Sequence, residues 1–165
     1  MKHAMATPPK PKGLLKWVFT LPLYLYRWHL GGLVGHSFLM VTHLGRKSGR
    51  RRQTGLEVAH YDPATQECIV VAAYGEQADW YRNIQAHPAL EVQVGSKRYP
   101  PVQRFLTFEE TWAFLSAYQR HHPRRLRVLL RFAGFPYDGS EEDLRAVAQL
   151  IRCVAFRPPQ HSESA

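Results

Sequence analysis

The sequence predicts an α+β fold in which about six mostly antiparallel strands form a small barrel with helices at its periphery. Three observations favour this class. Short strand-like runs alternate with turn signals in the first part of the chain, the connections between these runs are too short for parallel crossovers, and helical patterns gather towards the C-terminus. At 165 residues, the chain has the size of one domain that buries a core without disulfides.

The first elements precede the expected barrel. Residues 1–12 are rich in Pro and Lys and are expected to form a disordered tail. Residues 13–35 are expected to form an N-terminal helix, in which Lys16, Arg27 and Pro22 leave too short an apolar stretch to span a membrane. Two interpretations of this helix stay open: it packs on the domain, or it lies at a membrane interface with its Trp and Tyr side chains among lipid headgroups.

Three strands are expected next. Residues 37–44 form an apolar run that ends at a basic turn, and residues 52–61 follow and stop at the turn signal Asp62-Pro63. Residues 67–74 are apolar and rich in β-forming residues. Only a few residues separate each run from the next, so neighbouring strands should pair in antiparallel fashion.

A short helix and further strands complete the expected barrel. Residues 79–87 predict a helix with Asp79 as its N-cap and Pro88 as its stop. Residues 90–94 alternate between apolar and polar side chains, which indicates a half-buried strand. Residues 97–106 are expected to continue, after a two-residue turn, as one strand.

Helical patterns dominate the C-terminal part of the chain. A capping box formed by Thr107 and Glu110, a proline at a helix start (Pro123) and a serine cap (Ser140) predict three helices. The expected elements are helices over residues 107–120, 123–133 and from 140 onwards, and a last strand over residues 151–156. We therefore expect residues 36–158 to form one domain and residues 159–165 to form a disordered tail.

Composition limits the function. The formal net charge is +9, which favours an anionic partner such as a nucleic acid, a membrane surface or an acidic small molecule. The chain has only two cysteines, Cys68 and Cys153, and each lies in an apolar run that is typical of a buried free thiol. Free thiols favour a cytoplasmic protein. No pattern of ligand-type residues predicts a metal site.

A cluster of cations between the first two expected strands is the strongest functional signal. Residues 46–52 contain five cationic side chains, and Gly45 and Gly49 allow the backbone to bend sharply and to expose N–H groups. Such a turn can bind a phosphate or a row of carboxylates. The alternative is a solvated, charged hairpin tip. The cationic residues are Arg46, Lys47, Arg50, Arg51 and Arg52.

Three motifs, in this order, resemble one known family. They are Gly45-Arg46-Lys47-Ser48-Gly49, residues 79–84 (Asp-Trp-Tyr-Arg-Asn-Ile), and Pro88 with residues 92–95 (Val-Gln-Val-Gly). Together they resemble the deazaflavin (coenzyme F-420)-dependent nitroreductase family of the split β-barrel, flavin-reductase-like superfamily, which shares its barrel with FMN-binding and pyridoxamine-oxidase-like proteins. The resemblance is densest over residues 38–97 and implies an F-420-dependent oxidoreductase.

The resemblance gives the basic turn a role. The tail of F-420 carries a phosphodiester and a chain of glutamates, so the family implies that the turn binds this polyanion. Arg46, Lys47 and Ser48 are expected to hold the phosphate and the nearer tail, and Arg52 and Arg50 to reach further carboxylates. FMN is the alternative coenzyme because the barrel type is shared, but a single phosphate needs fewer cations.

The resemblance also places the deazaflavin ring. It implies that Ala73, Tyr74 and Gly75 lie beside the ring, with Gly75 allowing a close backbone approach. Trp80 and Asn83 are three residues apart and share a helix face, where Trp80 is expected either near the coenzyme or in the core. For Asn83, a hydrogen bond to the turn or to the ring edge is expected.

The implied reaction is hydride transfer between reduced F-420 and a hydrophobic acceptor such as a quinone, an activated alkene or a nitro compound. Tyr137 lies in a region that carries substrate-pocket tyrosines in relatives, and it is the candidate catalytic residue, as a hydrogen-bond or proton donor to the acceptor. The resemblance is compatible with a homodimer and with peripheral contact at the inner face of the cell membrane, for which the arginine-rich run over residues 120–131 is a second candidate surface.

Two other classes remain as alternatives. The same barrel can be a non-catalytic module that binds a fatty acid or sequesters the coenzyme. The arginine cluster, with Trp80 and Tyr81 for base stacking, can also serve a nucleic-acid-binding domain, which is the less favoured hypothesis. A steep dependence of oligonucleotide binding on salt would favour the nucleic-acid binder.

Overall fold

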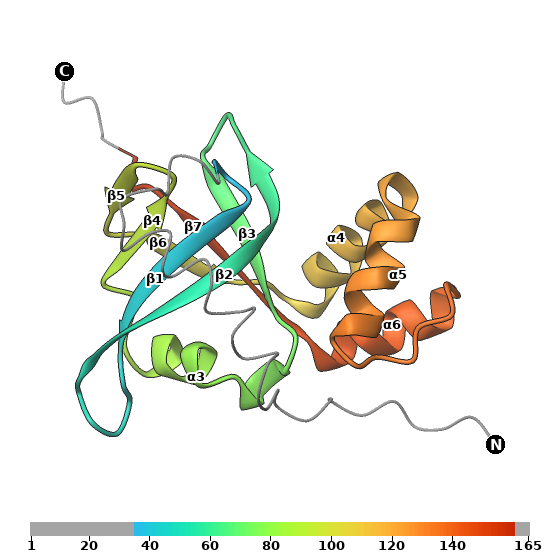
Figure 1. Ribbon diagram of the computed structural model, residues 1–165, viewed down its shortest axis with the longest axis horizontal. Coiled ribbons are helices and arrows are strands. Elements are labelled where there is room, and N and C mark those ends of the chain that lie inside the picture. Colours follow the sequence, from blue (N-terminus) through green and yellow to red (C-terminus); the bar gives the residue numbers. More distant parts are fainter. Residues whose placement is uncertain (1–34, 161–165) are drawn as a thin grey trace.

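The computed structural model describes residues 35–160, which form seven strands, four α-helices and one 3-10 helix (Figure 1). The expected tail over residues 1–12, nearly all of the expected helix over 13–35 and the last five residues lie outside the described residues. In chain order the elements are β1 (Phe38–Leu44), β2 (Arg51–Asp62), β3 (Glu67–Ala72), η1 (Gly75–Gln77), α3 (Asp79–Ala86), β4 (Glu91–Val94), β5 (Lys97–Tyr99), β6 (Val102–Phe105), α4 (Phe108–His121), α5 (Pro123–Phe132), α6 (Glu141–Leu150) and β7 (Arg152–Arg157).

The strands form one curled sheet in the order β5-β4-β1-β2-β3-β7-β6, and every neighbouring pair is antiparallel. The expected antiparallel α+β barrel is thereby confirmed. The long strand β2 belongs to both halves of the sheet, because residues up to Glu57 pair with β1 and residues from Val58 onwards pair with β3. The register shifts between Val58 and His60, and a shift of this kind bends a strand and lets the sheet curl.

The prediction of a single strand over residues 97–106 was wrong. Pro100 and Pro101 divide this stretch into β5, which pairs with β4, and β6, which pairs with β7 at the other end of the sheet order. Neither proline has an N–H group to donate to a neighbouring strand, so the ladder breaks there. This break carries the chain from one edge of the sheet to the other, which is the reason for seven strands where about six were expected.

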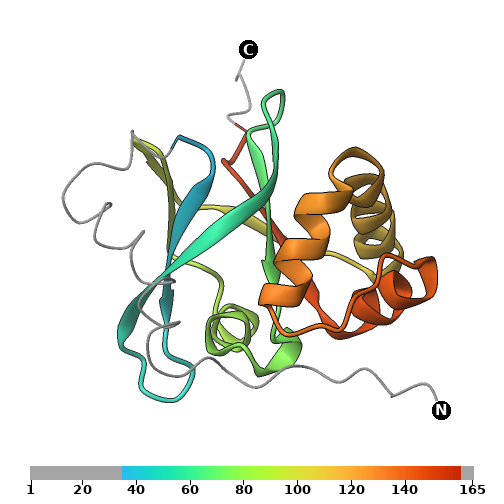
Figure 2. The same ribbon diagram turned by 45° about the vertical axis from the view of Figure 1, so that its right-hand side comes forward.

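The side chain of Gln103 connects β6 to α3 and to the segment that follows it. Its Oε1 accepts a hydrogen bond from the backbone N–H of Ala89 at 2.8 Å, and its Nε2 donates to the carbonyl oxygen of Ile84 at 3.0 Å. Both ends of the amide are therefore used to join the sheet edge to the helix that lies below the barrel (Figure 2).

The helix α3 begins one residue differently from the prediction. Ala78 is its N-cap and makes no side-chain capping bond, whereas Asp79, expected as the cap, lies in the first turn. A carboxylate in the first turn still interacts favourably with the helix dipole. The helix ends at Ala86, just before Pro88.

The three C-terminal helices confirm their predicted caps. Thr107 and Glu110 form the expected capping box, Pro123 stands at the first turn of α5, and the Ser140 hydroxyl accepts a hydrogen bond from the N–H of Asp143. These helices gather on one side of the sheet, beside β3 and β7, while α3 lies at one end of the barrel (Figures 1 and 2).

Two hydrophobic clusters stabilise this arrangement. The barrel cluster contains alternate residues of β3, such as Cys68 and Val70, together with Trp80 and Ile84 of α3. The helical cluster lies between α4, α5, α6 and the other face of β3 and β7, and it contains Cys153. Both cysteines are buried and free, as the sequence predicted.

Within residues 35–160, no helix has the length and apolar character required to cross a membrane.

Candidate functional site

The basic turn joins β1 to β2 over residues 45–50. It is closed by a hydrogen bond from the N–H of Gly45 to the carbonyl oxygen of Arg50 at 2.8 Å, and Gly49 adopts the left-handed backbone conformation with φ +63°. A Cβ atom on Gly45 would lie 2.6 Å from the Ser48 hydroxyl oxygen and 3.0 Å from Nε of Arg52. Glycine at position 45 therefore lets the turn fold tightly over its own side chains.

Within residues 45–50, the expectation that the turn exposes its backbone N–H groups was wrong for every residue except Lys47. The N–H groups of Ser48 and Gly49 both donate to the carbonyl oxygen of Gly45, that of Arg50 contacts the Ser48 hydroxyl at 3.4 Å, and that of Arg46 donates to Asn83. The donors of Ser48, Gly49 and Arg50 close the turn itself, and that of Arg46 binds the turn to α3. Anion binding by the turn must therefore depend mainly on its side chains.

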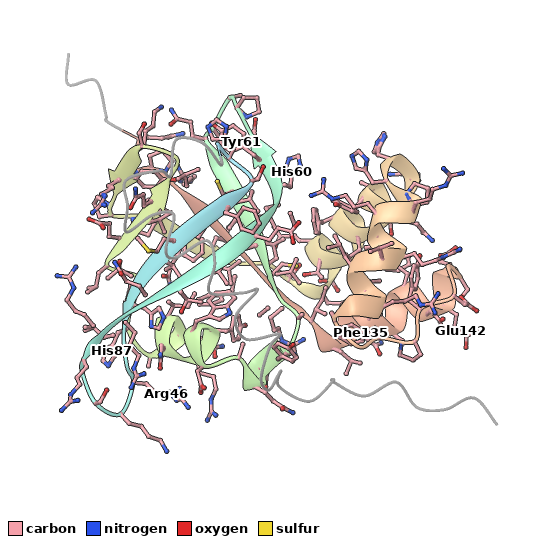
Figure 3. The ribbon with its side chains drawn as sticks, in the orientation of Figure 1. Arg46, His60, Tyr61, His87, Phe135 and Glu142 are labelled. Carbon is pink, nitrogen blue, oxygen red and sulfur yellow. The ribbon has the colours of Figure 1, made fainter. Side chains whose placement is uncertain are left out.

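Arg46 is fixed against α3 (Figure 3). The side-chain Oδ1 of Asn83 accepts both the backbone N–H and the Nη1 of Arg46, each at 3.0 Å, and the Nη2 of Arg46 contacts the Asp79 carboxylate at 3.2 Å. The expected bond between Asn83 and the turn is thus present in the structure. Arg46 keeps further N–H donors, because a guanidinium has five.

The other cations, on the turn and at the start of β2, are directed to solvent. Lys47, Arg50, Arg51 and Arg52 are exposed, and none of them has a carboxylate within salt-bridge distance in the described part of the chain. The exposed Ser48 hydroxyl stands between them in sequence. Uncompensated cations on one short turn create a local positive field suited to a polyanion.

His43 was not predicted as part of the site. It lies at the end of β1, is only 2 % exposed, and contacts Asn83 through Nδ1 at 3.2 Å and Thr54 through Nε2 at 3.0 Å. Burial lowers the pKa of this imidazole below its usual value of 6.5, the Arg52 charge acts in the same direction, and a hydrogen bond with the backbone at Leu44 partly opposes them. The available sequence signal was a histidine in an otherwise apolar strand next to the turn.

The stretch over residues 73–77 contains the residues expected beside the coenzyme ring. Ala73 and Tyr74 are partly buried, and burial raises the pKa of the Tyr74 hydroxyl. Gly75 is buried and has φ +52°, and a Cβ atom on it would lie 2.3 Å from the carbonyl oxygen of Leu150. The close approach at Gly75 is therefore made by the end of α6. This contact accounts for the requirement for glycine at position 75, and no ligand is needed to explain it.

Trp80 points into the barrel cluster and is 9 % exposed. Its ring meets that of Tyr81 edge to face, with centroids 6.0 Å apart. The core-packing alternative stated for Trp80 accounts for this position, and contact with a coenzyme remains a prediction.

The structure does not bring Tyr137 together with the basic turn. Tyr137 belongs to the helical cluster, and its hydroxyl accepts a hydrogen bond from Nε2 of Gln119 at 2.7 Å. Figures 1 and 3 show the helices of this cluster on the side of the molecule away from the turn, with Phe135 among them and Arg46 at the turn. Burial raises the pKa of the Tyr137 hydroxyl, so it is protonated at neutral pH. Its catalytic role stays a prediction.

A cavity of about 440 Å³ opens between α4, α6 and β7. Arg152, one of its lining residues, donates to the Glu76 carboxylate at 3.0 and 3.3 Å, which ties the cavity wall to the 73–77 stretch. The cavity is lined by Leu106, Phe108, Thr111, Ala148, Gln149, Ile151 and Arg152.

The curled antiparallel sheet with peripheral helices forms a split β-barrel with a basic turn between β1 and β2. The sequence model of the F-420H(2)-dependent quinone reductase family matches residues 27–125, more than half of the chain, and the protein therefore belongs to this family. It is an oxidoreductase whose coenzyme is the deazaflavin F-420, and the resemblance inferred from the three motifs is confirmed.

Three of the solved structures that match this chain have low sequence identity to it. An F-420-H2-dependent reductase is 22% identical, with 74% of this chain and 96% of that chain covered and a TM-score of 0.49. A structure described as a domain-swapped dimer is 19% identical, with 88% and 100% covered and a TM-score of 0.50. An FMN-binding protein from Nostoc punctiforme related to pyridoxamine 5'-phosphate oxidase is 14% identical, with 90% and 81% covered and a TM-score of 0.44. A comparison with curated proteins gave no match.

Proposed function

We propose that the protein transfers hydride from reduced F-420 to a hydrophobic acceptor, with a quinone as the favoured acceptor and activated alkenes or nitro compounds as further candidates. The observation that carries the proposal is the set of exposed cations on the turn over residues 45–50 and the start of β2, which lack carboxylate partners in the described part of the chain. The family supplies the coenzyme, and the turn supplies the place for its anionic tail.

The residues of the turn fit such a tail chemically. Lys47 offers a mobile point charge, Arg50 and Arg52 offer planar forks for phosphate or carboxylate oxygens, and the Ser48 hydroxyl can donate one hydrogen bond. Arg46 contributes its charge and its remaining N–H donors from a fixed position against Asn83. In this proposal the protein binds the tail mostly through side chains, because within residues 45–50 every backbone donor except the N–H of Lys47 already has a partner.

The ring end of the coenzyme is proposed to lie by Ala73, Tyr74 and Gly75, with Trp80 and Asn83 behind them on α3. When bound, the reduced deazaflavin supplies the hydride. The tasks of the protein are to orient the acceptor, to exclude water and to keep the reacting groups at contact distance. The cavity beside Arg152 is lined by Leu106, Phe108 and Ile151, among others, and we propose that it receives the apolar part of the acceptor.

The decisive experiment compares coenzyme binding by two charge-reversed variants. Lys47→Glu combined with Arg50→Glu changes the turn, while Arg124→Glu combined with Arg131→Glu makes the same change in net charge on the exposed face of α5. We expect the turn variant to raise the Kd for F-420 at least about tenfold, since a charge-assisted hydrogen bond contributes about 1.5–3 kcal/mol. The α5 variant should stay close to the parent protein.

A second ligand distinguishes binding of the coenzyme's anionic tail from binding of its ring. The deazaflavin chromophore without its phosphodiester and glutamates should bind the parent protein and the turn variant equally. If both variants lowered F-420 affinity to the same extent, net charge and not the turn would be responsible, and the proposal would fail. Oxidation of reduced F-420 that requires added menadione would support a quinone acceptor, and binding without such oxidation would point to another class of acceptor.

A further inference from the structure

A chain of hydrogen bonds connects the core of the barrel to the basic turn. It runs from Thr54 on β2 to His43 on β1, then to Asn83 on α3, and ends at Arg46 in the turn. His43 and Asn83 are almost fully buried, at 2 % and 3 % exposure. Residues far apart in the sequence are thus joined by polar contacts in an otherwise apolar region.

The contacts of Asn83 fix the protonation state of His43. Because Oδ1 of Asn83 accepts two hydrogen bonds from Arg46, its Nδ2 must be the atom that faces His43, and an amide nitrogen can only donate. Nδ1 of His43 is therefore an acceptor without a proton. The ring proton lies on Nε2, where it donates to the Thr54 hydroxyl oxygen.

The neutral imidazole in turn fixes the orientation of the Asn83 amide. A flipped amide would point Nδ2 at two N–H donors of Arg46 and leave Nδ1 of His43 facing an oxygen, so all three contacts would be lost. The observed orientation holds the first cation of the turn against α3. Lys47, Arg50 and Arg52 then project from a turn whose shape is set before an anion arrives, and such preorganisation lowers the entropic cost of binding.

We propose that neutral His43 is a positioning residue for anion binding: through Asn83 it holds Arg46 and so presents the remaining cations of the turn to the ligand. This inference rests on the proposed function, in which the turn binds the anionic tail of F-420. His43 itself need not touch the coenzyme.

Protonation of His43 would undo this arrangement. A proton on Nδ1 would face the Nδ2 donor of Asn83, and the amide could relieve the conflict only by releasing Arg46. The charge of Arg52, on β2, disfavours the imidazolium, and the hydrogen bond with the backbone at Leu44 opposes this effect in part. Arg46 is connected to the ring through Asn83. The carboxylate of Asp79, on α3, contacts Arg46 at the end of the hydrogen-bonded chain that is opposite to Thr54.

The positioning role predicts an unusual pH dependence. A histidine that contacted the anion directly would strengthen binding when it became cationic, whereas the positioning role predicts weaker binding. Because burial holds the pKa of His43 below its usual value of 6.5, we expect the Kd of the parent protein for F-420 to be constant from about pH 7.5 down to about pH 6.5 and to rise as the pH falls further. The measurement is equilibrium binding followed by intrinsic tryptophan fluorescence, which requires no turnover.

Two substitutions at His43 make the test specific. His43→Asn places an amide oxygen near the position of Nδ1, can accept from Asn83 and does not titrate, so its affinity should stay near that of the parent at about pH 7.5 and be independent of pH. His43→Leu keeps the volume but has no acceptor, and we expect a Kd at least about fivefold higher at every pH. Equal affinity of His43→Leu and the parent, or tighter parent binding at low pH, would overturn the proposal.

A measurement without coenzyme distinguishes the positioning role of His43 from a folding defect. In the parent protein, nitrogen NMR should show His43 as the neutral tautomer with the proton on Nε2, and the Arg46 amide should be protected from exchange until His43 is replaced by Leu. A mixture of tautomers would overturn the inference even if the coenzyme binds. If instead the parent protein bound no F-420 at about pH 7.5, the proposed function would fail together with the positioning role, whatever the NMR spectrum shows.

Discussion

A Cβ atom on Gly75 would lie 2.3 Å from the carbonyl oxygen of Leu150, closer than ordinary atomic contacts allow. The contact joins the stretch that is proposed to flank the coenzyme ring to the end of α6. Gly75 also has φ +52°, a backbone conformation that side chains other than glycine adopt at a cost. Position 75 therefore excludes a side chain for two separate reasons.

Alanine substitutions at two glycines distinguish the cost of backbone strain from the cost of the steric overlap with Leu150. Gly75→Ala should lower the free energy of unfolding by about 3 kcal/mol, from about 1–2 kcal/mol of backbone strain and about 1–3 kcal/mol of overpacking. Gly49→Ala has a similar φ of +63° but no atom within 4 Å of the added Cβ, so it should cost only the strain. Chemical denaturation measures both. Equal losses for the two variants would show that the contact with Leu150 relaxes at no cost.

Much of the fold was predictable because its signals are local. Strand β1 ends where the basic turn begins and β2 ends at Asp62, and the caps at Thr107 and Ser140 lie within three residues of the groups they bind. The break at Pro100-Pro101 also had a local signal, since adjacent prolines remove two donors. The strand-like pattern of the flanking residues obscures this signal.

The site was less predictable because its geometry depends on contacts across the chain. The three motifs indicated the turn and α3. The cluster of cations did not indicate which of its side chains forms hydrogen bonds with another part of the protein. Arg46 is held by Asn83, 37 residues away, and Asn83 by His43, 40 residues away. A buried histidine in an apolar strand reads as a core residue unless its partners are known.

The two cysteines should be inert in the folded protein. Burial raises the pKa of Cys68 to about 11 and that of Cys153 to about 12, so both thiols stay protonated near neutral pH. Cys68 lies in the barrel cluster and Cys153 in the helical cluster, so they lie on opposite faces of the sheet and cannot pair. We expect Ellman's reagent to react only as fast as the protein unfolds, whereas an added thiol at exposed position 96, Ser96→Cys, should react at once. Rapid reaction of the parent protein would contradict this burial.

Removal of the Tyr137 hydroxyl tests whether this residue acts in packing or in catalysis. Tyr137→Phe loses the hydrogen bond from Gln119, which still has the carbonyl oxygen of Gly139 as an acceptor at 2.9 Å. Because the ring lies in the helical cluster, we expect the free energy of unfolding to fall by about 1 kcal/mol and F-420 affinity to stay unchanged. kcat with menadione should stay within about twofold of the parent value. A tenfold loss of kcat without a loss of stability would instead establish the catalytic role expected from the family.

The cavity beside the 73–77 stretch leads to the last prediction. Gln149 lines this cavity but is itself exposed, so Gln149→Trp can partly fill it from the solvent side without disturbing the buried wall. If the apolar part of the acceptor binds there, KM for menadione should rise by about tenfold while the Kd for F-420 is unchanged, because the basic turn is untouched. Glu141→Trp, at an exposed position of the same helix that does not line the cavity, is the matched control and should change neither constant. An unchanged KM for the Gln149 variant would place the acceptor elsewhere, and a parallel rise of KM in both variants would point to the added indole rather than to the cavity.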